Sequence, residues 1–357
     1  MGTNTLTHRP AGTGGPPASR RGYLDVLRCL AIFLVIALHC TAGQIVRPEL
    51  FGTRTWLACD IVNGFARMGV PLFFMISGFL LLSSGKTDDI RGFYIHRFSK
   101  LLPPFLFWDV LYYFETCAAG GQAPGLLPFL QELTGQGSKY HLWFIYQIAG
   151  LYLLMPFLKK ILDHSTRREQ LAFLAVVLLQ PTIFRFLNII QRTVTFSPFR
   201  ALVEGYAGFV LLGYLLGSCQ IPKRGRMAIY AVGLLGLGGC IVGNFLTSSP
   251  EEIVLYFNEG YSITHYMSAG ALFLLVKECA ERIPAWALRR AASLSGRTFG
   301  IYFIHVLILD LYGAALGRLG LAPGAGLRIA GSFVFVSAVS VCAVYGLSKI
   351  PLLRRVV

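Results

Sequence analysis

The chain has 357 residues, of which 55% are hydrophobic and only 14% are charged, and its mean hydropathy is +0.60. A soluble globular domain carries about 25% charged residues and about 45–50% apolar ones. The composition therefore excludes a soluble globular protein, a disordered chain and a small disulfide-stapled domain. It predicts a protein that crosses a membrane several times.

The net charge is +15, from 32 Lys and Arg against 17 Asp and Glu. A basic excess of this size raises the question of a nucleic-acid partner. However, membrane proteins concentrate Lys and Arg in their cytoplasmic loops. Most of the basic residues here fall in alternate loops between apolar segments, at 85–100, 159–169, 220–226, 277–297 and the C-terminus. The charge therefore indicates topology, and we expect no nucleic-acid partner.

Residues 1–20 are rich in Thr, Gly and Pro, which predicts a flexible cytoplasmic tail before one membrane domain at 21–357. Ten later segments approach the ~20 apolar residues that a spanning helix needs. They cover 24–46, 60–84, 101–118, 141–158, 170–190, 200–219, 227–247, 262–280, 298–316 and 328–348. We therefore predict an all-α integral membrane protein, a bundle of about ten transmembrane helices with both termini cytoplasmic.

The first of these segments contains three ionisable residues, Asp25, Arg28 and His39. Ionisable groups are costly inside a bilayer and often mark function. Arg28 and His39 are 11 residues apart, about three whole helical turns, so they share one face and lie about 16 Å apart along the axis. Asp25 lies three residues before Arg28 on the same face.

The shared face of Asp25, Arg28 and His39, here called the polar stripe, allows two interpretations. In the first, an elongated ligand lies along the helix, Arg28 holds its anionic end, and His39 takes a proton from a hydroxyl at the far end. In the second, Arg28 reaches the lipid headgroups beside Asp25, and His39 is hydrogen-bonded to a neighbouring helix. The spacing alone leaves both open.

Further motifs follow in chain order. They are Gly-Val-Pro-Leu-Phe-Phe-Met-Ile-Ser-Gly-Phe at 69–79, His96-Arg97-Phe98 with Lys100 before Pro103-Pro104, His-Leu-Trp-Phe at 141–144, and Gly-Ile-Tyr-Phe-Ile-His at 300–305. With Arg28 and His39, they resemble the membrane acyltransferase family 3 over about 24–310. The length and the 141–144 segment are similar to the small branch of O-acetyltransferases that modify bacterial surface polysaccharides, including enterobacterial common antigen.

The chain departs from the family pattern at one motif. The family often has Pro after the late histidine, whereas His305 is followed by Val306, which weakens the inference that His305 has a role. The chain also leaves no room for the additional periplasmic esterase-like domain that some larger members carry. The resemblance therefore implies a single membrane domain.

The resemblance implies an O-acyltransferase of the bacterial inner membrane that uses cytoplasmic acetyl-CoA and acylates a surface or lipid-linked glycan. His39 matches the catalytic histidine, Arg28 the motif arginine, and Arg97 a position thought to engage the donor. Arg91 and Lys100 are suited to the donor phosphates as well. For these two, ordinary inside-positive charge is the alternative interpretation. The other partners we expect are membrane lipids.

The mechanism implied is direct transfer, in which His39 takes the proton from a sugar hydroxyl as it attacks the thioester carbonyl. Asp25 is about 21 Å from His39 along the helix, so we expect it to orient Arg28 or contact the donor. An acyl-histidine relay stays open. The eight Cys show no C-x-x-C pair or metal spacing, and we expect no metal.

Other polar residues in the apolar segments are candidates for acceptor binding. For His141 and Trp143 this role stands beside the alternative that Trp143 is an interfacial anchor, and His305 is a third candidate. A further group is expected to pair internally or to line the cavity: Asp60, Arg67, Asp109, Glu115, Glu204 and Asp310. The sequence does not decide between these two roles.

The main alternative function is a transporter or flippase for a glycan or acyl unit, because polytopic bundles with intramembrane charges also describe carriers. Carriers often show broken helices at corresponding positions of two halves, and no such symmetry is evident here. A purely structural subunit would not need this many intramembrane ionisable groups. The in-phase pair of Arg28 and His39 therefore favours the enzyme.

Overall fold

The computed structural model describes residues 22–191, 206–260, 262–321 and 323–357. The described chain is helical and contains no strand. The tail predicted at 1–20 and Glu204 lie outside the described residues. The α-helices are α1 (Gly22–Ile45), α2 (Arg54–Ala66), α3 (Gly69–Leu82), α4 (Ile90–Gly120), α5 (Leu126–Gly135), α6 (Trp143–Asp163), α7 (Arg167–Gln191), α9 (Tyr206–Ser218), α10 (Lys223–Thr247), α11 (Ile263–Glu278), α12 (Ala285–Ser295), α13 (Thr298–Arg318) and α14 (Ala325–Leu347).

Six described stretches have the length and apolar composition of membrane spans. They are Gly22–Ile45, Arg54–Leu82, Tyr140–Asp163, Lys223–Thr247, Thr298–Arg318 and Ala325–Leu347. The all-helical, multi-pass membrane fold is thereby confirmed. The other four predicted segments fall on α4, α7, α9 and α11, of which α9 has 13 residues and α11 has 16. Both are shorter than the ~20 residues of a full span, so about ten crossings remains a prediction.

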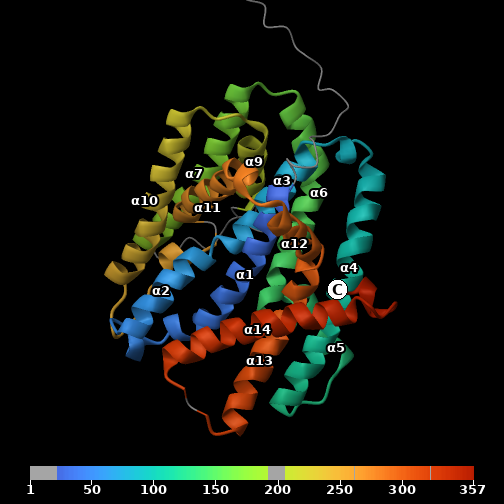
Figure 1. Cartoon of the computed structure of the whole chain (residues 1–357), viewed down its shortest axis with the longest axis vertical. Coiled ribbons are helices and arrows are strands. Elements are labelled where there is room, and N and C mark those ends of the chain that lie inside the picture. The colour runs from blue at the N-terminus through green and yellow to red at the C-terminus, as the bar shows by residue number, and fades with distance from the viewer. Residues whose placement is uncertain (1–21, 192–205, 261, 322) are drawn as a thin grey trace, which may run out of the picture.

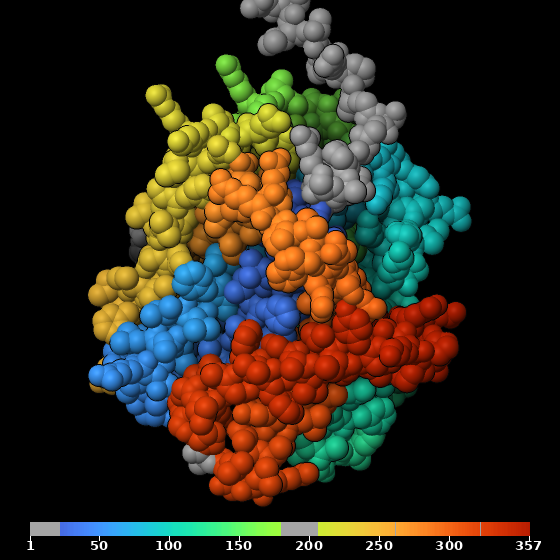
Figure 2. Space-filling model, in the orientation of Figure 1, coloured from blue at the N-terminus to red at the C-terminus, as the bar shows by residue number. Residues whose placement is uncertain are grey.

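Helix α1 lies in the middle of the bundle, where α2, α3, α12, α13 and α14 pack around it (Figure 1). Its apolar side chains Leu27, Ala31 and Ile36 are fully buried. In Figure 2, α14 forms a continuous band across the visible face of the molecule, beside the exposed part of α1. The ionisable residues of α1 are therefore surrounded by protein on several sides rather than presented only to lipid.

The predicted segment 60–84 is two helices, α2 and α3, joined at Arg67 and Met68. A Cβ at Gly69 would lie 2.8 Å from the Ala31 carbonyl oxygen, so α3 begins in direct contact with the α1 backbone. Only a glycine permits this approach. The break leaves Arg67 at the end of α2, inside the stretch that has the composition of a membrane span.

Helices α3 and α9 are in backbone contact through glycine. A Cβ added at Gly78 would lie 2.1 Å from the carbonyl oxygen of Val210, and one added at Gly213 would lie 2.1 Å from that of Met75. Small residues let transmembrane helices approach this closely, and the resulting van der Waals contact holds them together. Helices α3 and α9 therefore pack as a close pair, and α3 also packs against α1.

Gly78→Ala is expected to destabilise the protein by about 1–3 kcal/mol, because the new methyl group must displace a backbone carbonyl. The measurement is thermal unfolding of purified protein in detergent. Gly150→Ala on α6 is the matched control, because nothing lies within 4 Å of a Cβ at that position. An equal melting temperature for both variants would contradict the packing argument.

Four glycines spaced along α10, at Gly233, Gly236, Gly239 and Gly243, form a pattern that predicts close packing against another helix. The partner is α11: a Cβ at Gly236 would lie 2.7 Å from the Thr264 carbonyl oxygen, and one at Gly233 would lie 2.2 Å from Ala271. The prediction is confirmed at these two positions.

Candidate active site

The start of α1 holds Arg28 in a fixed direction. One guanidinium nitrogen of Arg28 donates to Asp25 at 2.9 Å, and the Ser295 hydroxyl at the end of α12 donates to the same carboxylate oxygen at 2.6 Å. Both side chains of the ion pair are partly exposed. Asp25 was expected to orient Arg28 or to contact the donor; the structure places it in an ion pair with Arg28, and Ser295, which the sequence did not indicate, donates to the same carboxylate.

A cavity of about 280 Å³, here called the basic cavity, opens beside this ion pair. It is lined by Arg28, Phe73, Ser77, Arg97, Lys100, Leu101, Phe144, Ile148, Tyr152, Ser295, Thr298, Phe299 and Tyr302. These residues come from α1, α3, α4, α6, α12 and α13. The helix bundle thus brings three basic side chains, from two distant parts of the sequence, around one space.

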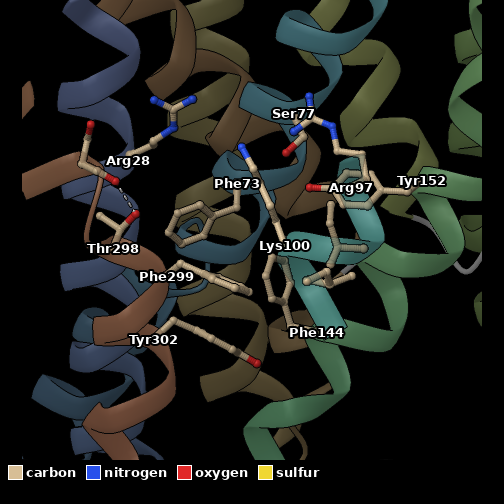
Figure 3. A pocket seen from close by; sticks show the side chains of 13 residues that line it. Arg28, Phe73, Ser77, Arg97, Lys100, Phe144, Tyr152, Thr298, Phe299 and Tyr302 are labelled. Atoms are coloured by element: carbon tan, nitrogen blue, oxygen red, sulfur yellow. Dashed lines mark hydrogen bonds between the residues drawn. The ribbon is translucent and has the colours of Figure 1, made fainter. Parts of the chain in front are cut away.

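The basic cavity has a charged end and an aromatic end (Figure 3). The guanidinium groups of Arg28 and Arg97 and the amine of Lys100 lie near one another, whereas Phe299 and Tyr302 extend away from them. Such a site suits a ligand with an anionic head and an apolar or thioether arm, because guanidinium and ammonium groups bind phosphate oxygens.

Arg97 and Lys100 are the two basic side chains of this cavity that form no ion pair with a described carboxylate. The guanidinium carbon of Arg97 lies 5.6 Å from the Phe93 ring centroid and 5.7 Å from that of Tyr152. Within the described parts of the chain, no carboxylate forms an ion pair with Arg97, and its Nε is buried without a hydrogen-bond partner. The two rings hold the guanidinium in place while leaving its hydrogen-bond donors available to a ligand.

At the aromatic end, Tyr302 connects the basic cavity to a cluster of three histidines. The Tyr302 ring lies 5.4 Å from the His141 ring and 6.1 Å from that of His305. His39 lies 5.1 Å from His305 and 6.5 Å from His141, all between ring centroids. Three residues that are widely separated in sequence thus meet at one point, and two of them, His141 and His305, are fully enclosed.

The hydrogen bonds of His305 determine which ring nitrogen carries its proton. Nδ1 lies 2.6 Å from the Tyr302 carbonyl oxygen, which can only accept, so the neutral ring is protonated at Nδ1. Nε2 then carries the lone pair, and it is buried without a partner. His305 therefore offers a hydrogen-bond acceptor inside the histidine cluster.

Tyr112 of α4 fixes the turn of α13 that carries His305. Its buried hydroxyl donates to the Phe303 carbonyl at 2.5 Å and accepts from the Leu307 amide at 3.2 Å. A regular α-helix pairs these two backbone groups directly, so the hydroxyl lies against the turn of α13 that contains Val306.

Lys139, in the loop before His141, forms ion pairs with residues of α4 and α13. Its amine lies 2.6 Å from a Glu115 carboxylate oxygen and 2.9 Å from an Asp310 oxygen. Burial lowers the pKa of Lys139, but the hydrogen bonds to these two carboxylates outweigh it and raise the pKa overall. Glu115 and Asp310 were expected either to pair internally or to line the cavity; both pair with Lys139, and Asp310 also lines a second cavity described next.

A second cavity, here called the His39 cavity, is lined by one histidine of the cluster, His39. It has a volume of about 310 Å³ and is lined by His39, Cys40, Gly43, Gln44, Leu309, Asp310, Tyr312, Gly313, Ala314, Arg328, Ile329 and Ser332. Its polar lining combines a carboxylate, a guanidinium and hydroxyl groups. His39 therefore lines this cavity, and the rings of His305 and Tyr302 link it to the basic cavity.

The comparison with known families decides the class of the protein. The sequence model of the acyltransferase 3 family, described as an acyltransferase domain, matches residues 21–347. The chain belongs to the acyltransferase 3 family. No curated protein and no solved structure matches the chain. The match covers every residue named in the two cavities and the histidine cluster.

Not every residue predicted for the site of this acyltransferase lies there. Arg91 is exposed and does not line the basic cavity, and Trp143 packs its ring 5.4 Å from that of Tyr206 instead of lining either cavity. Asp60 accepts a hydrogen bond from Asn244 at 2.9 Å, away from the histidines. Among the described residues, no group of three or more His, Cys, Asp or Glu is arranged to hold a metal ion.

The site also contains residues that sequence reasoning missed. Tyr302, Ser295, Tyr112, Lys139 and Arg328 were not singled out. Tyr302 lies within the late motif at 300–305, so the motif itself was the available signal. The others are brought in from helices and loops whose sequence has no distinctive pattern.

Proposed function

We propose that this acyltransferase is an inner-membrane O-acetyltransferase that transfers an acetyl group from cytoplasmic acetyl-CoA to a hydroxyl of a cell-surface or lipid-linked glycan. The observation that carries the proposal is that His39 lines one cavity and is linked through the rings of His305 and Tyr302 to the basic cavity. One cavity suits a phosphate-bearing thioester, and the other suits a hydroxylated acceptor.

The donor would enter the basic cavity with its phosphates toward Arg28, Arg97 and Lys100. Its pantetheine arm would then run along Phe299 and Tyr302 toward the histidine cluster. Charge-assisted hydrogen bonds from guanidinium groups to phosphate are among the strongest that proteins make. The reacting thioester would thus be delivered to the enclosed end of the cavity.

The acceptor would occupy the His39 cavity, where Asp310, Arg328 and Ser332 offer hydrogen bonds to sugar hydroxyls. His39 would take the proton of the attacking hydroxyl while that oxygen forms its bond to the thioester carbonyl carbon. The carbon–sulfur bond then breaks, the proton passes to the departing thiolate, and the products are an O-acetyl ester and free CoA. The His305 ring lies 5.1 Å from the His39 ring, centroid to centroid, and its Nε2 lone pair would help to orient the His39 ring.

The direct test is transfer of radiolabel from [¹⁴C]acetyl-CoA into the glycan fraction of membranes from a host strain that lacks this chain. Purified protein in lipid nanodiscs is expected to make that fraction radioactive and to release free CoA in equal amount. Mild alkali should then release the label as acetate, as expected for an ester. If the protein moves unmodified glycan across vesicles and no label is incorporated, the transporter interpretation replaces this one.

A further inference from the structure

Tyr140, a residue that the proposed reaction does not use, places an exposed aromatic ring beside His39. In the described part of the chain, three rings lie near that of His39, centroid to centroid: His305 at 5.1 Å, Tyr140 at 5.2 Å and His141 at 6.5 Å. His141 and His305 are buried, whereas 55% of the Tyr140 surface is exposed. Of these three neighbours, Tyr140 is therefore the one that a molecule from outside the bundle can contact without a rearrangement of the core.

The backbone before Tyr140 is fixed by a tight turn against α4. Gly137 has a φ of 86°, and a Cβ at this position would lie 2.9 Å from that of Leu142 and 3.1 Å from an Asp109 carboxylate oxygen. Only glycine adopts this conformation at no cost in so little space. The next residue, Ser138, donates its amide to the same buried carboxylate at 2.7 Å. The start of the loop is thus held by a carboxylate inside the bundle.

Lys139 fixes the last residue before Tyr140. Its ion pairs with Glu115 and Asp310 connect the loop to α4 and α13. Asp310 lines the His39 cavity, as His39 does. Tyr140 is therefore connected to that cavity twice, through its own ring contact with His39 and through the ion pair between the preceding residue and Asp310.

The Tyr140 side chain itself takes no part in holding the loop. Its ring contacts those of His39 and His141, and no described group forms a hydrogen bond with its hydroxyl. An exposed tyrosine near the end of a membrane span is often an interfacial anchor. An anchor, however, requires neither a fixed backbone nor contact with a histidine of the site, and Tyr140 has both.

The distance between the two rings limits what can lie against Tyr140. A hydroxyl whose proton His39 takes must come within about 3 Å of an imidazole nitrogen, and the Tyr140 ring centre lies 5.2 Å from the imidazole centre. The sugar ring that carries this hydroxyl is then within reach of the tyrosine. One face of a pyranose consists of C–H groups, which pack favourably on the electron-rich face of an aromatic ring.

We infer that the Tyr140 ring packs against the C–H face of the acceptor sugar whose hydroxyl His39 deprotonates. The inference rests on the proposed function. It makes the acceptor unit a pyranose and makes Tyr140 a determinant of acceptor specificity. Tyr140 does not line the basic cavity, so it has no part in donor binding.

The test is the [¹⁴C]acetyl-CoA transfer assay, with the amount of glycan-bearing membranes and the concentration of acetyl-CoA varied separately. Tyr140→Leu is expected to raise the apparent KM for the membranes about 3- to 10-fold, the scale of one lost aromatic contact. The KM for acetyl-CoA should not change. Tyr140→Phe keeps the ring, and its KM for the membranes should stay well below that of Tyr140→Leu.

Phe114→Leu is the matched control, because Phe114 on α4 is 54% exposed and lines neither the basic cavity nor the His39 cavity. Both of its KM values should equal those of the wild-type protein. Tyr140→Gln is a second variant without the ring, and it keeps the test decisive where Tyr140→Leu fails to fold. Its KM for the membranes should rise as that of Tyr140→Leu does.

Three results overturn the inference: an unchanged KM for the membranes in both variants without the ring, an equal rise in the KM for acetyl-CoA, and a Tyr140→Phe variant as poor as Tyr140→Leu. An interfacial anchor gives the first of these together with a lower melting temperature. Failure of the proposed function is distinguishable, because the wild-type protein would then transfer no label at all.

Discussion

Replacing His39 by Ala is expected to lower acyl transfer about 100- to 10,000-fold, the usual contribution of a general base. The imidazole lines the acceptor side of the site and lies beside His305, and no other described histidine lines the His39 cavity. The measurement is the initial rate of label transfer from [¹⁴C]acetyl-CoA into membrane glycan, at equal amounts of folded protein.

The binding of acetyl-CoA should survive in His39→Ala, because the basic cavity is lined by other residues. Melting temperatures with and without acetyl-CoA therefore separate a lost base from a lost fold. Glycan acylation at the wild-type rate in this variant would eliminate His39 as the base. His39→Gln is the conservative companion: it keeps a hydrogen-bonding group but cannot take up the proton, and it should be equally inactive.

Replacing Arg97 by Ala is expected to weaken acetyl-CoA binding about 10- to 100-fold. No described carboxylate forms an ion pair with its guanidinium, which lies against the Phe93 and Tyr152 rings at the charged end of the basic cavity. A ligand at 100 times its Kd stabilises a folded protein by about 2.7 kcal/mol, and at the same concentration the variant should gain only about 0.4–1.4 kcal/mol. The measurement is the acetyl-CoA-dependent shift in melting temperature.

Arg91→Ala supplies the matched control, since Arg91 lies on the same helix, is exposed and does not line the cavity. Its acetyl-CoA-dependent shift should equal that of the wild-type protein. The assignment of Arg97 to the donor site fails if both variants keep the full shift, and it fails equally if Arg91→Ala loses as much as Arg97→Ala. In the second case, general positive charge and not a specific contact would attract the donor.

Composition and periodicity were sufficient to predict a helical membrane protein, because the cost of exposing polar backbone to lipid leaves few alternatives to helices. The same reasoning predicted the shared face of Asp25, Arg28 and His39, because helical geometry fixes the direction of residues on one helix. The Asp25–Arg28 ion pair follows from that local rule. The number of membrane crossings could not be predicted from composition alone, because α9 and α11 are apolar but shorter than a full span.

The residues that meet across helices could not be derived in this way. The neighbours of His39 in the cluster, His141 and His305, come from distant parts of the chain, and the motifs marked them without showing that the three rings meet. The bridge from Tyr112 into α13 and the Lys139 ion pairs also depend on which helices become neighbours. Tertiary packing decides such contacts.

The sequence by itself determined the membrane class, the polar stripe of α1 and the motif residues, because each depends on composition or on spacing within one segment. Only the tertiary structure decided that the rings of His305 and Tyr302 link His39 to the basic cavity, and that Arg91 and Trp143 line neither cavity. The physical reason is that a cavity exists between helices. Its lining depends on close packing such as that of Gly78 and Gly213, which no single segment encodes.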